Sequence, residues 1–508
     1  MDNIVIIDCG SQFTQLIARR VREMNIHSTV LPWDVPVERV REGAPSGVVI
    51  SGGPDSVNDE GAIAVEREIL DLGVPVLGVC YGMQLLAKYL GGQVVSGEKP
   101  EYGTTPIKRE GASRLLKEIP DSFDVLMSHG DRVKQVPPAF RAIAYTKHGV
   151  IAAMESDDGR FFGLQFHPEV GHTQHGSLVL RHFLFDICGC KGDWDLGDWI
   201  ERSVEEIRVR VGGDSVVCGL SGGVDSSVAA ALVHRAIGRQ LKCIFVDHGL
   251  MRLDEAAQVL ASYDGLGLSV LPVDASDLFL GRLAGVTDPE SKRKVIGELF
   301  IHVFDEESGK IGQVEWLLQG TIYPDVIESG SKKGSAVIKS HHNVGGLPEH
   351  MKLKLLEPLR DLFKDEVREI GRRLGVPGAI VDRHPFPGPG LAVRCLGEIT
   401  KERLDVLRAA DAIFTEELLR AGLYDSIWQS FCVLLPVRTV GVMGDGRTYS
   451  EVLALRAVNS ADAMTADWTR LPADLLDVVA KRICNEVRGI NRVVLDVTSK
   501  PPATIEWE

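Results

Sequence analysis

The chain has 508 residues, of which 44% are hydrophobic and 25% are charged, and its formal net charge is −15. This length predicts two to four domains, and this balance is typical of a globular protein rather than of a disordered or membrane protein. The acidic charge argues against a nucleic-acid partner, because nucleic-acid binders usually carry a basic face.

The cysteines and the N-terminus indicate the cellular compartment of the protein. Nine cysteines are scattered without a CxxC pair, which suits a reducing compartment. Cys188 and Cys190 are close together but have no further soft ligands nearby, so we interpret them as incidental. The start, Met1-Asp2-Asn3-Ile4, lacks a signal segment, and no apolar run reaches the roughly 20 residues that span a bilayer. We expect a cytoplasmic protein without a membrane partner.

Residues 1 to about 190 alternate apolar runs with amphipathic stretches. Strands are expected at residues 4–8, 47–51 and 74–79, and helices at residues 15–24 and 83–90. This alternation predicts an open, mostly parallel sheet covered by helices.

A glycine-flanked cysteine, Gly78-Val79-Cys80-Tyr81-Gly82, lies between the last of these strands and its helix. A cysteine there has the geometry of a nucleophile elbow, although a cysteine among apolar residues is more often a small core residue. His167-Pro168-Glu169 favours the nucleophile, because His167 can take the proton of the thiol while Glu169 fixes the histidine tautomer. A glycine turn, Ser51-Gly52-Gly53-Pro54, can aim an N–H group at an oxyanion.

These three motifs, in this order, resemble those of the class I glutamine amidotransferases. The resemblance implies that Cys80 attacks the glutamine amide, His167 shuttles protons and Glu169 orients His167. It also implies that the N–H groups of Gly53 and Tyr81 form the oxyanion hole, that ammonia leaves, and that a glutamyl thioester is then hydrolysed.

Residues 191 to about 205 have no strand pattern and are expected to form a linker that leads into a helix.

The run Ser221-Gly222-Gly223-Val224-Asp225-Ser226-Ser227 then lies between an apolar stretch and an alanine-rich one, which predicts a strand, a tight loop and a helix. Such a corner binds phosphate through backbone N–H groups, and Asp225 can orient Mg²⁺. A bare Gly-Gly is often an ordinary turn, but the whole run resembles the pyrophosphate loop of ATP pyrophosphatases. That resemblance implies adenylation with release of pyrophosphate.

The sheet should continue with strands at residues 241–247 and 269–274, and another strand near residue 317. Asp247 ends the first of these strands, so either Asp247 or the Gly249-Leu250 backbone after it contacts adenosine, or Asp247 caps a helix. Two segments rich in histidine, proline and glycine follow at residues 339–348 and 383–391. The pair His341 and His342 lacks an HExxH pattern or a cysteine cluster, so hydrogen bonding is preferred to metal ligation. We interpret the proline-rich segment as a binding loop.

With these segments and the ending Lys500-Pro-Pro-Ala-Thr-Ile-Glu506-Trp-Glu508, the whole chain resembles the glutamine-hydrolysing GMP synthase family. One departure is Ala392, where the family more often has glycine. The resemblance implies two doubly wound, mostly parallel α/β domains followed by a smaller α+β domain. Their expected bounds are residues 1–190 for glutamine amidotransferase, 191–390 for ATP pyrophosphatase and 391–508 for dimerisation and completion of the site for xanthosine 5′-monophosphate (XMP).

The same resemblance implies the reaction. ATP, the co-substrate, adenylates the 2-oxo group of XMP, and ammonia then displaces AMP to give GMP, the last step of de novo guanine nucleotide synthesis. Mg²⁺ is expected to balance the charge of the leaving pyrophosphate. The implied ATP-binding residues are the run 221–227, Asp247 and Lys364; the implied XMP-binding residues are Arg293, His341, His342, Gln429, Lys500 and Glu506. From the residues alone, Lys364, Arg293, Gln429, Lys500 and Glu506 would be placed on the surface.

Residues from about 391 mix a helix at 401–419 with strands at 430–437 and 491–497. The apolar run 431–437 has little polar alternation, so it is a strand covered on both faces or one paired across a subunit boundary. The resemblance implies a homodimer through this part. We also expect that removal of the chain from Lys500 on abolishes synthesis while ATP binding persists.

Free ammonia is mostly protonated in neutral water, so the two reactions should communicate, and ATP plus XMP should stimulate glutamine hydrolysis. Two alternatives remain open at this point. The same modules occur in an adenylating amidotransferase such as an NAD synthetase, which the C-terminal segments do not fit. A non-catalytic nucleotide-binding regulator is the other, and the intact set of Cys80, His167 and Glu169 weighs against it.

Overall fold

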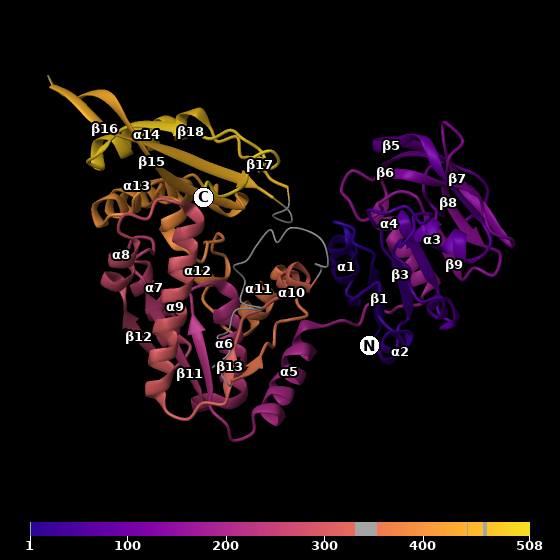
Figure 1. The fold of residues 1–508 in the computed structure, drawn as a ribbon, viewed down its shortest axis with the longest axis horizontal. Helices are drawn as coiled ribbons and strands as arrows, with labels where there is room; N and C mark the ends of the chain where they lie inside the picture. Colours follow the sequence, from indigo (N-terminus) through magenta and orange to yellow (C-terminus); the bar gives the residue numbers. More distant parts are fainter. Residues whose placement is uncertain (1, 331–352, 444–445, 461–464) are drawn as a thin grey trace. The chain divides into compact units, whose positions relative to one another are not determined.

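The computed structural model describes residues 2–330, 353–443, 446–460 and 465–508. The chain forms two compact units, one built mainly from Met1–Asp195 and the other mainly from Leu196–Ser329 and Ala336–Glu508 (Figure 1). No described helix is both long and apolar enough to cross a membrane.

The first unit is built on a nine-stranded sheet with a parallel half and an antiparallel half. The parallel strands are, in spatial order, β2 (His27–Pro32), β1 (Asn3–Asp8), β3 (Gly47–Ile50), β4 (Val76–Val79) and β9 (Phe161–Leu164). The antiparallel strands are β8 (Ile151–Ser156), β7 (Phe140–Thr146), β5 (Gln93–Arg109) and β6 (Ser122–Gln135). β3, β4 and β9 are buried throughout, as expected for strands with both faces covered. The prediction of a mostly parallel sheet is confirmed for the first half, whereas β2 and the antiparallel half were not predicted.

Helices cover the parallel half of this sheet. They are α1 (Thr14–Glu23), α2 (Val37–Glu42), α3 (Tyr81–Tyr89) and α4 (Gly176–Arg181), with short helices η1 (Arg67–Asp71) and η2 (His182–Ile187). Alternate residues of β1, Val5 and Ile7, share one hydrophobic cluster with α2 and α3. α3 therefore lies directly against the strands that precede and follow Cys80.

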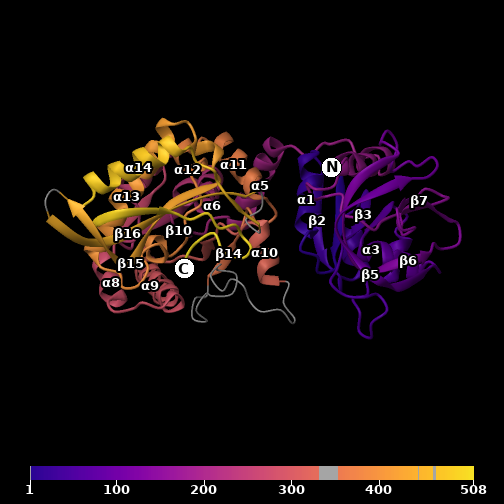
Figure 2. The same cartoon turned by 90° about the horizontal axis from the view of Figure 1, so that it is seen from above.

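The second unit contains a five-stranded, fully parallel sheet (Figure 2). Its order is β12 (Val270–Asp274), β11 (Leu241–Asp247), β10 (Val216–Leu220), β13 (Trp316–Leu318) and β14 (Lys354–Leu356). On one face α5 (Leu196–Val211), α6 (Val224–Ile237) and α11 (Lys364–Arg373) pack together, and on the other lie α8 (Ser276–Leu283) and α9 (Pro289–Ile311). The doubly wound prediction is confirmed, and the carboxyl ends of these strands meet at one edge, where such sheets bind ligands.

The remaining helices around this sheet are short. They are α7 (Glu255–Gly265), α10 (Tyr323–Gly330), α12 (Gly378–Val381), η3 (Gly238–Gln240), η4 (Gly390–Val393) and η5 (Tyr424–Ser426).

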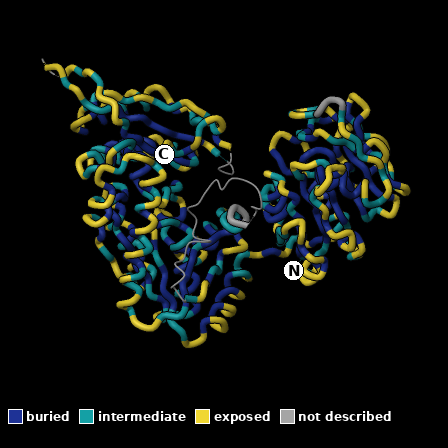
Figure 3. Tube along the Cα trace, viewed as in Figure 1, coloured by how far each residue is buried: buried dark blue, intermediate teal, exposed yellow. Residues whose placement is uncertain are grey.

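The C-terminal part is α+β, as predicted. β15 (Gln429–Met443) pairs antiparallel with β16 (Gly446–Asn459), which also pairs with β17 (Asp467–Trp468) and β18 (Ile490–Leu495). α13 (Lys401–Arg420) and α14 (Ala473–Glu486) pack on this sheet. One face of β15 shares a hydrophobic core with α13 and with the five-stranded sheet that contains β10, hereafter the phosphate-loop sheet. The opposite face packs against Ile505 of the C-terminal tail. The prediction that this strand is covered on both faces is therefore confirmed for its first half, while the far end of the β15–β16 hairpin is exposed (Figure 3).

Candidate active sites

Cys80 lies at a strained turn between β4 and α3. Its backbone has φ 54° and ψ −104°, a conformation that non-glycine residues rarely adopt. A Cβ atom on Gly82 would lie 2.2 Å from the carbonyl oxygen of Ile50, and one on Gly78 would lie 2.4 Å from the backbone of Gly82. Both flanking glycines are therefore required sterically, because α3 must approach the strands this closely to present Cys80 at the turn.

His167 and Glu169 follow β9 and lie beside Cys80. His167 Nδ1 is 2.7 Å from Glu169 Oε1, and both side chains are buried. Burial disfavours the imidazolium, but the charge of Glu169 and a hydrogen bond with Cys80 outweigh burial and raise the pKa of His167 to about 10. The ring of Phe13 stands edge-on to His167 at 5.0 Å, and Arg20 donates to the Glu169 carbonyl at 3.1 Å. The raised pKa makes His167 a ready acceptor for the proton of the neighbouring Cys80 thiol, as the activation of a cysteine nucleophile requires.

A cavity of about 370 Å³ opens onto Cys80 and His167. Gly53 and Tyr81 also line it, and the described structure has no acceptor for the backbone N–H of either residue. These N–H groups can therefore stabilise an oxyanion. The wall formed by residues 128–131 of β6 was not predicted from the sequence; the Cys80 thiol is 3.5 Å from the Ser128 carbonyl oxygen.

The predicted phosphate loop joins β10 to α6. Gly222 has φ +74°, Ser221 Oγ accepts from the Gly223 N–H at 3.3 Å, and Ser226 Oγ lies 3.2 Å from Ser221 Oγ. Ser227 is fully buried; its hydroxyl donates to the Gly223 carbonyl at 2.7 Å and lies 2.8 Å from the Tyr263 hydroxyl. Ser227 therefore shapes the loop, while Ser221 stays exposed where a phosphate would bind.

Lys364, the first residue of α11, lies at this loop although it is 139 positions away in the sequence. Its Nζ is 2.5 Å from Asp225 Oδ2. The other carboxylate oxygen, Asp225 Oδ1, is buried and has no hydrogen-bond partner among the described residues. An oxygen of this kind fits a hard cation such as Mg²⁺. The described residues contain no cluster of three or more candidate metal ligands, so substrate phosphates and water would have to complete the coordination of an ion held there.

Asp247 ends β11 at the same edge of the sheet. Its Oδ1 accepts the N–H of Gly249 at 2.9 Å, whereas the residue that precedes α7 is Asp254. Asp247 therefore caps the turn after β11 and is not a helix cap, so that alternative was wrong.

Three of the residues expected to bind XMP meet at the C-terminal tail. Gln429 donates to Glu506 Oε1 at 2.7 Å, and Arg293 donates to the backbone oxygen of Glu508 at 2.5 Å. The same carboxylate of Glu506 accepts two hydrogen bonds from Arg394, at 2.7 and 3.0 Å. Lys292 is fully buried and pairs with Glu508 at 2.5 Å. Lys292, Arg293 and Arg394 thus hold the C-terminal tail in place through charge-assisted hydrogen bonds.

Comparisons with known proteins agree along the whole length. Family models described as glutamine amidotransferase class-I, NAD synthase and GMP synthase C terminal domain match residues 5–187, 195–280 and 416–507. A curated protein of Clostridium botulinum, GMP synthase [glutamine-hydrolyzing], is 54% identical over 99% of both chains. The protein of the same name from Paraburkholderia phytofirmans is 56% identical over 100% of both. A solved glutamine amidotransferase from Thermotoga maritima is 23% identical, covers 41% of this chain and 85% of its own, and has a TM-score of 0.28.

The chain belongs to the glutamine-hydrolysing GMP synthase family. The relatives at this identity match the full chain, whereas the NAD synthase model matches only residues 195–280 of the second unit. The expectation of family membership is confirmed.

Three further residues were expected to bind XMP. The backbone of Lys500 pairs with that of Ala466. His341 and His342 lie outside the described residues.

Sequence reasoning missed Lys292, Arg394 and Glu508. The signal for Arg394 was present, because a single arginine within the apolar run Leu391-Ala-Val-Arg-Cys is a charge that must find a buried partner. Nothing in the spacing of Lys292 distinguishes it from the exposed lysines of the same helix.

Proposed function

We propose that this chain aminates XMP to GMP with ammonia that it releases from glutamine, and that ATP activates XMP by adenylation. The observation that carries the proposal is the presence, in one chain, of a strained cysteine with a charged histidine partner and of a glycine loop with a lysine and a carboxylate. Relatives over the full length carry the name GMP synthase [glutamine-hydrolyzing] and support it.

In the amidotransferase domain, residues 1–190, the Cys80 thiol passes its proton to His167, and the resulting thiolate attacks the glutamine amide carbon. The N–H groups of Gly53 and Tyr81 bind the oxyanion, and His167, oriented by Glu169, gives its proton to the departing ammonia. A glutamyl thioester forms, and His167 then takes a proton from the water that hydrolyses it. Glutamate is released and the thiol is restored.

In the ATP pyrophosphatase domain, residues 191–390, the N–H groups of the loop Ser221–Ser227 bind the phosphates of ATP. The XMP 2-oxo oxygen attacks the α-phosphorus, and pyrophosphate leaves. Lys364 exchanges its contact with Asp225 for the phosphates and neutralises their charge. Mg²⁺, when bound by Asp225 and the phosphates, supplies further charge neutralisation. Ammonia then adds at C2 and AMP departs.

In the C-terminal domain, residues 391–508, the tail forms the XMP site. Gln429 and Glu506 suit the edges of the xanthine base, and Arg293 and Lys500 suit the phosphate, because amides and carboxylates recognise donors and acceptors while cations bind phosphate. His341 and His342 are proposed to contact the same nucleotide.

We also propose a homodimer in the cytoplasm. Val437, Val440, Val442 and Tyr449 expose apolar surface along the outer half of the β15–β16 hairpin, and such a surface is a common subunit contact. All nine cysteines are free, which suits a reducing compartment.

The test is to supply Mg²⁺-ATP, an ammonium salt and either XMP or nicotinic acid adenine dinucleotide, and to measure the amidated product, AMP and pyrophosphate. Formation of GMP, AMP and pyrophosphate in equal amounts, from XMP only, is expected. Amidation of the dinucleotide instead, or XMP-independent release of pyrophosphate, would overturn the proposed substrate.

A further inference from the structure

The loop that follows β11 is held in place by a helix of the C-terminal part. Arg408 of α13 donates through Nε to the carbonyl oxygen of Met251 at 2.9 Å and through Nη2 to that of Gly249 at 2.5 Å. One helical turn further on, Asp411 Oδ2 lies 3.3 Å from Arg252 Nε. Residues three apart share one face of a helix. Arg408 and Asp411 therefore bind this loop from a single face of α13, at Gly249, Met251 and Arg252.

The residue between these points is also fixed from the C-terminal part. The carbonyl oxygen of Leu250 accepts the N–H of Leu391 at 2.8 Å, and Leu250 itself is fully buried. Asp411 is in turn anchored, because its Oδ1 accepts the N–H of Cys432 in β15 at 2.9 Å. Every residue from 249 to 252 is therefore tied to an element beyond residue 390.

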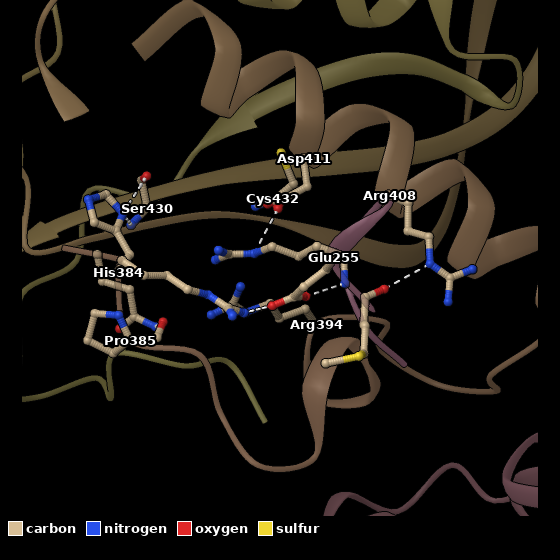
Figure 4. A network of polar contacts seen from close by, with 12 residues as sticks. Glu255, His384, Pro385, Arg394, Arg408, Asp411, Ser430 and Cys432 are labelled. Atoms are coloured by element: carbon tan, nitrogen blue, oxygen red, sulfur yellow. Dashed lines mark hydrogen bonds and ion pairs between the residues drawn. The ribbon is translucent and has the colours of Figure 1, made fainter. Parts of the chain in front are cut away.

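These contacts continue to the phosphate loop. In the part of the network drawn around Glu255 in Figure 4, the N–H of Arg252 donates to Glu255 Oε2 at 2.7 Å, and Glu255 forms an ion pair with Arg383. Arg383 Nη1 donates to the carbonyl oxygen of Gly222 at 3.1 Å. The loop after β11 and the phosphate loop lie at the same carboxyl edge of the sheet, and one polar network connects both to α13.

We propose that Arg408 is a positioning residue for ATP: by fixing the backbone of residues 249–251, helix α13 sets the surface that receives the adenosine. This inference rests on the proposed ATP site and extends it. A guanidinium suits the task, because it stays charged when buried and its fork of donors reaches two carbonyl oxygens at once. Without Arg408, the carbonyl groups of Gly249 and Met251 lose this donor and the loop is free to shift.

The helix offers a matched control in Arg403. Its side chain is 16% exposed, against 18% for Arg408, and it also donates to two backbone carbonyl groups and contacts one carboxylate. Those acceptors, Leu396 and Glu398, lie outside the loop after β11. Arg403 and Arg408 are therefore similar in burial and in the kinds of group they bind, but only Arg408 binds the loop after β11.

The experiment compares Arg408→Met, Arg408→Lys and Arg403→Met in ammonium-dependent GMP synthesis by the full chain. Arg408→Met should raise the KM for ATP roughly tenfold, the loss expected for charge-assisted hydrogen bonds, with the KM for XMP and basal glutaminase unchanged. Arg408→Lys should recover part of the effect, because one ammonium can still reach a carbonyl. Arg403→Met should lower the unfolding temperature like Arg408→Met but leave the KM for ATP unchanged.

Asp225→Asn in the same assay separates the two claims. If Asp225→Asn impairs ATP use while Arg408→Met and Arg403→Met have the same KM for ATP, the positioning role is wrong and the ATP site stands. If Asp225→Asn leaves ATP use unaffected, the ATP site itself is wrong and the inference falls with it. Should Arg408→Met fail to fold, an unchanged KM for ATP in Arg408→Lys would equally overturn the positioning role.

Discussion

Two neighbours raise the pKa of His167 against the effect of burial: Glu169, whose carboxylate lies 2.7 Å from the imidazole, and Cys80. A histidine whose pKa is raised on folding stabilises the fold fully below its unfolded pKa of about 6.5, and this stabilisation is lost as the pH rises through the folded value. The folded value is about 10. Between these two pH values, the contribution of this histidine to the free energy of unfolding should therefore decline.

Glu169→Gln tests this dependence. The amide carries no charge, so the pKa of His167 should fall and the decline in stability between pH 7 and 10 should become shallower than in the wild type. The measurement is thermal unfolding of both proteins across this range, and the difference between them removes the titration of other groups. Parallel curves for the two proteins would show that Glu169 does not control this charge. The variant should also lose glutamine hydrolysis.

Glu506 is central to the proposed XMP site, since Gln429 and Arg394 both donate to its carboxylate. Glu506→Gln should raise the KM for XMP roughly 10- to 100-fold, the size expected when charged hydrogen bonds are lost, with little change in the KM for ATP. Steady-state kinetics with ammonium measures this. The control is Glu451→Gln, which removes the carboxylate partner of Arg403 in the same domain; an equal change in both variants would contradict a role for Glu506 at the nucleotide.

At the scale of elements, the turn that carries Cys80 depends on the close approach of α3 to β3. Gly82→Ala would place a Cβ atom 2.2 Å from the Ile50 carbonyl oxygen, so the helix must move. We expect glutamine-dependent synthesis to fall roughly 100-fold, the cost of a misplacement of about 1 Å, while ammonium-dependent synthesis persists. Gly171→Ala is the control, because a Cβ atom there meets nothing within 4 Å. Equal glutaminase activity in both variants would refute the steric account.

Whether a strand can be predicted from the sequence depends on its place in the sheet and on what covers its faces. The buried parallel strands β1, β3, β4, β10 and β11 are continuous apolar runs, because helices cover both faces, and they were recognised. β2 lies at the sheet edge with a mixed sequence, HSTVLP, and was missed. β5 is 17 residues long but contains two glycines and two prolines, which local propensity assigns to turns. Pairing with β6 and β7 overrides that propensity.

Residues of the candidate sites could be predicted where their chemistry depends on a local motif, and not where it depends on a distant partner. Cys80, His167, Glu169 and the loop at residues 221–227 were predicted because their chemistry depends on local motifs, and the structure brings each set together. Arg408 was not predicted, since its partner Met251 lies 157 positions away; the apolar run around Arg394 signals a buried charge, but not its partner Glu506, 112 positions away. Long-range polar pairs leave no periodic trace in a single sequence.

At the scale of the whole molecule, the C-terminal part is joined to the phosphate-loop sheet by one hydrophobic core. The tail also holds three buried cations, Lys292, Arg394 and Arg456, through residues after 497. Removal of the chain from Lys500 on would take the carboxylate partners from Lys292 and Arg394, which is strongly destabilising, whereas Arg456 would keep its contacts with Asp496 and Thr498. The expectation that such a protein still binds ATP therefore needs a direct binding measurement, and Glu506→Gln is the cleaner test of the tail.

The proposed dimer contact is a prediction at the same scale. Val440 and Val442 are 51% and 75% exposed on the hairpin, so Val440→Glu should place a charge in the contact and produce a monomer. Light scattering measures the mass, and basal glutaminase should be retained. Val209→Glu, at a position 77% exposed on α5, should leave the dimer intact. A Val440→Glu protein of unchanged dimeric mass would place the contact elsewhere.

The central claim is that two separate sites in one chain make and use ammonia. Wild type and Cys80→Ala are incubated with Mg²⁺-ATP and XMP, with either glutamine or an ammonium salt, and GMP and pyrophosphate are measured. We expect the wild type to make GMP from both donors and Cys80→Ala to make it from ammonium alone at the wild-type rate. Glutamine-dependent synthesis by Cys80→Ala, or no synthesis by the wild type from either donor, would contradict this account.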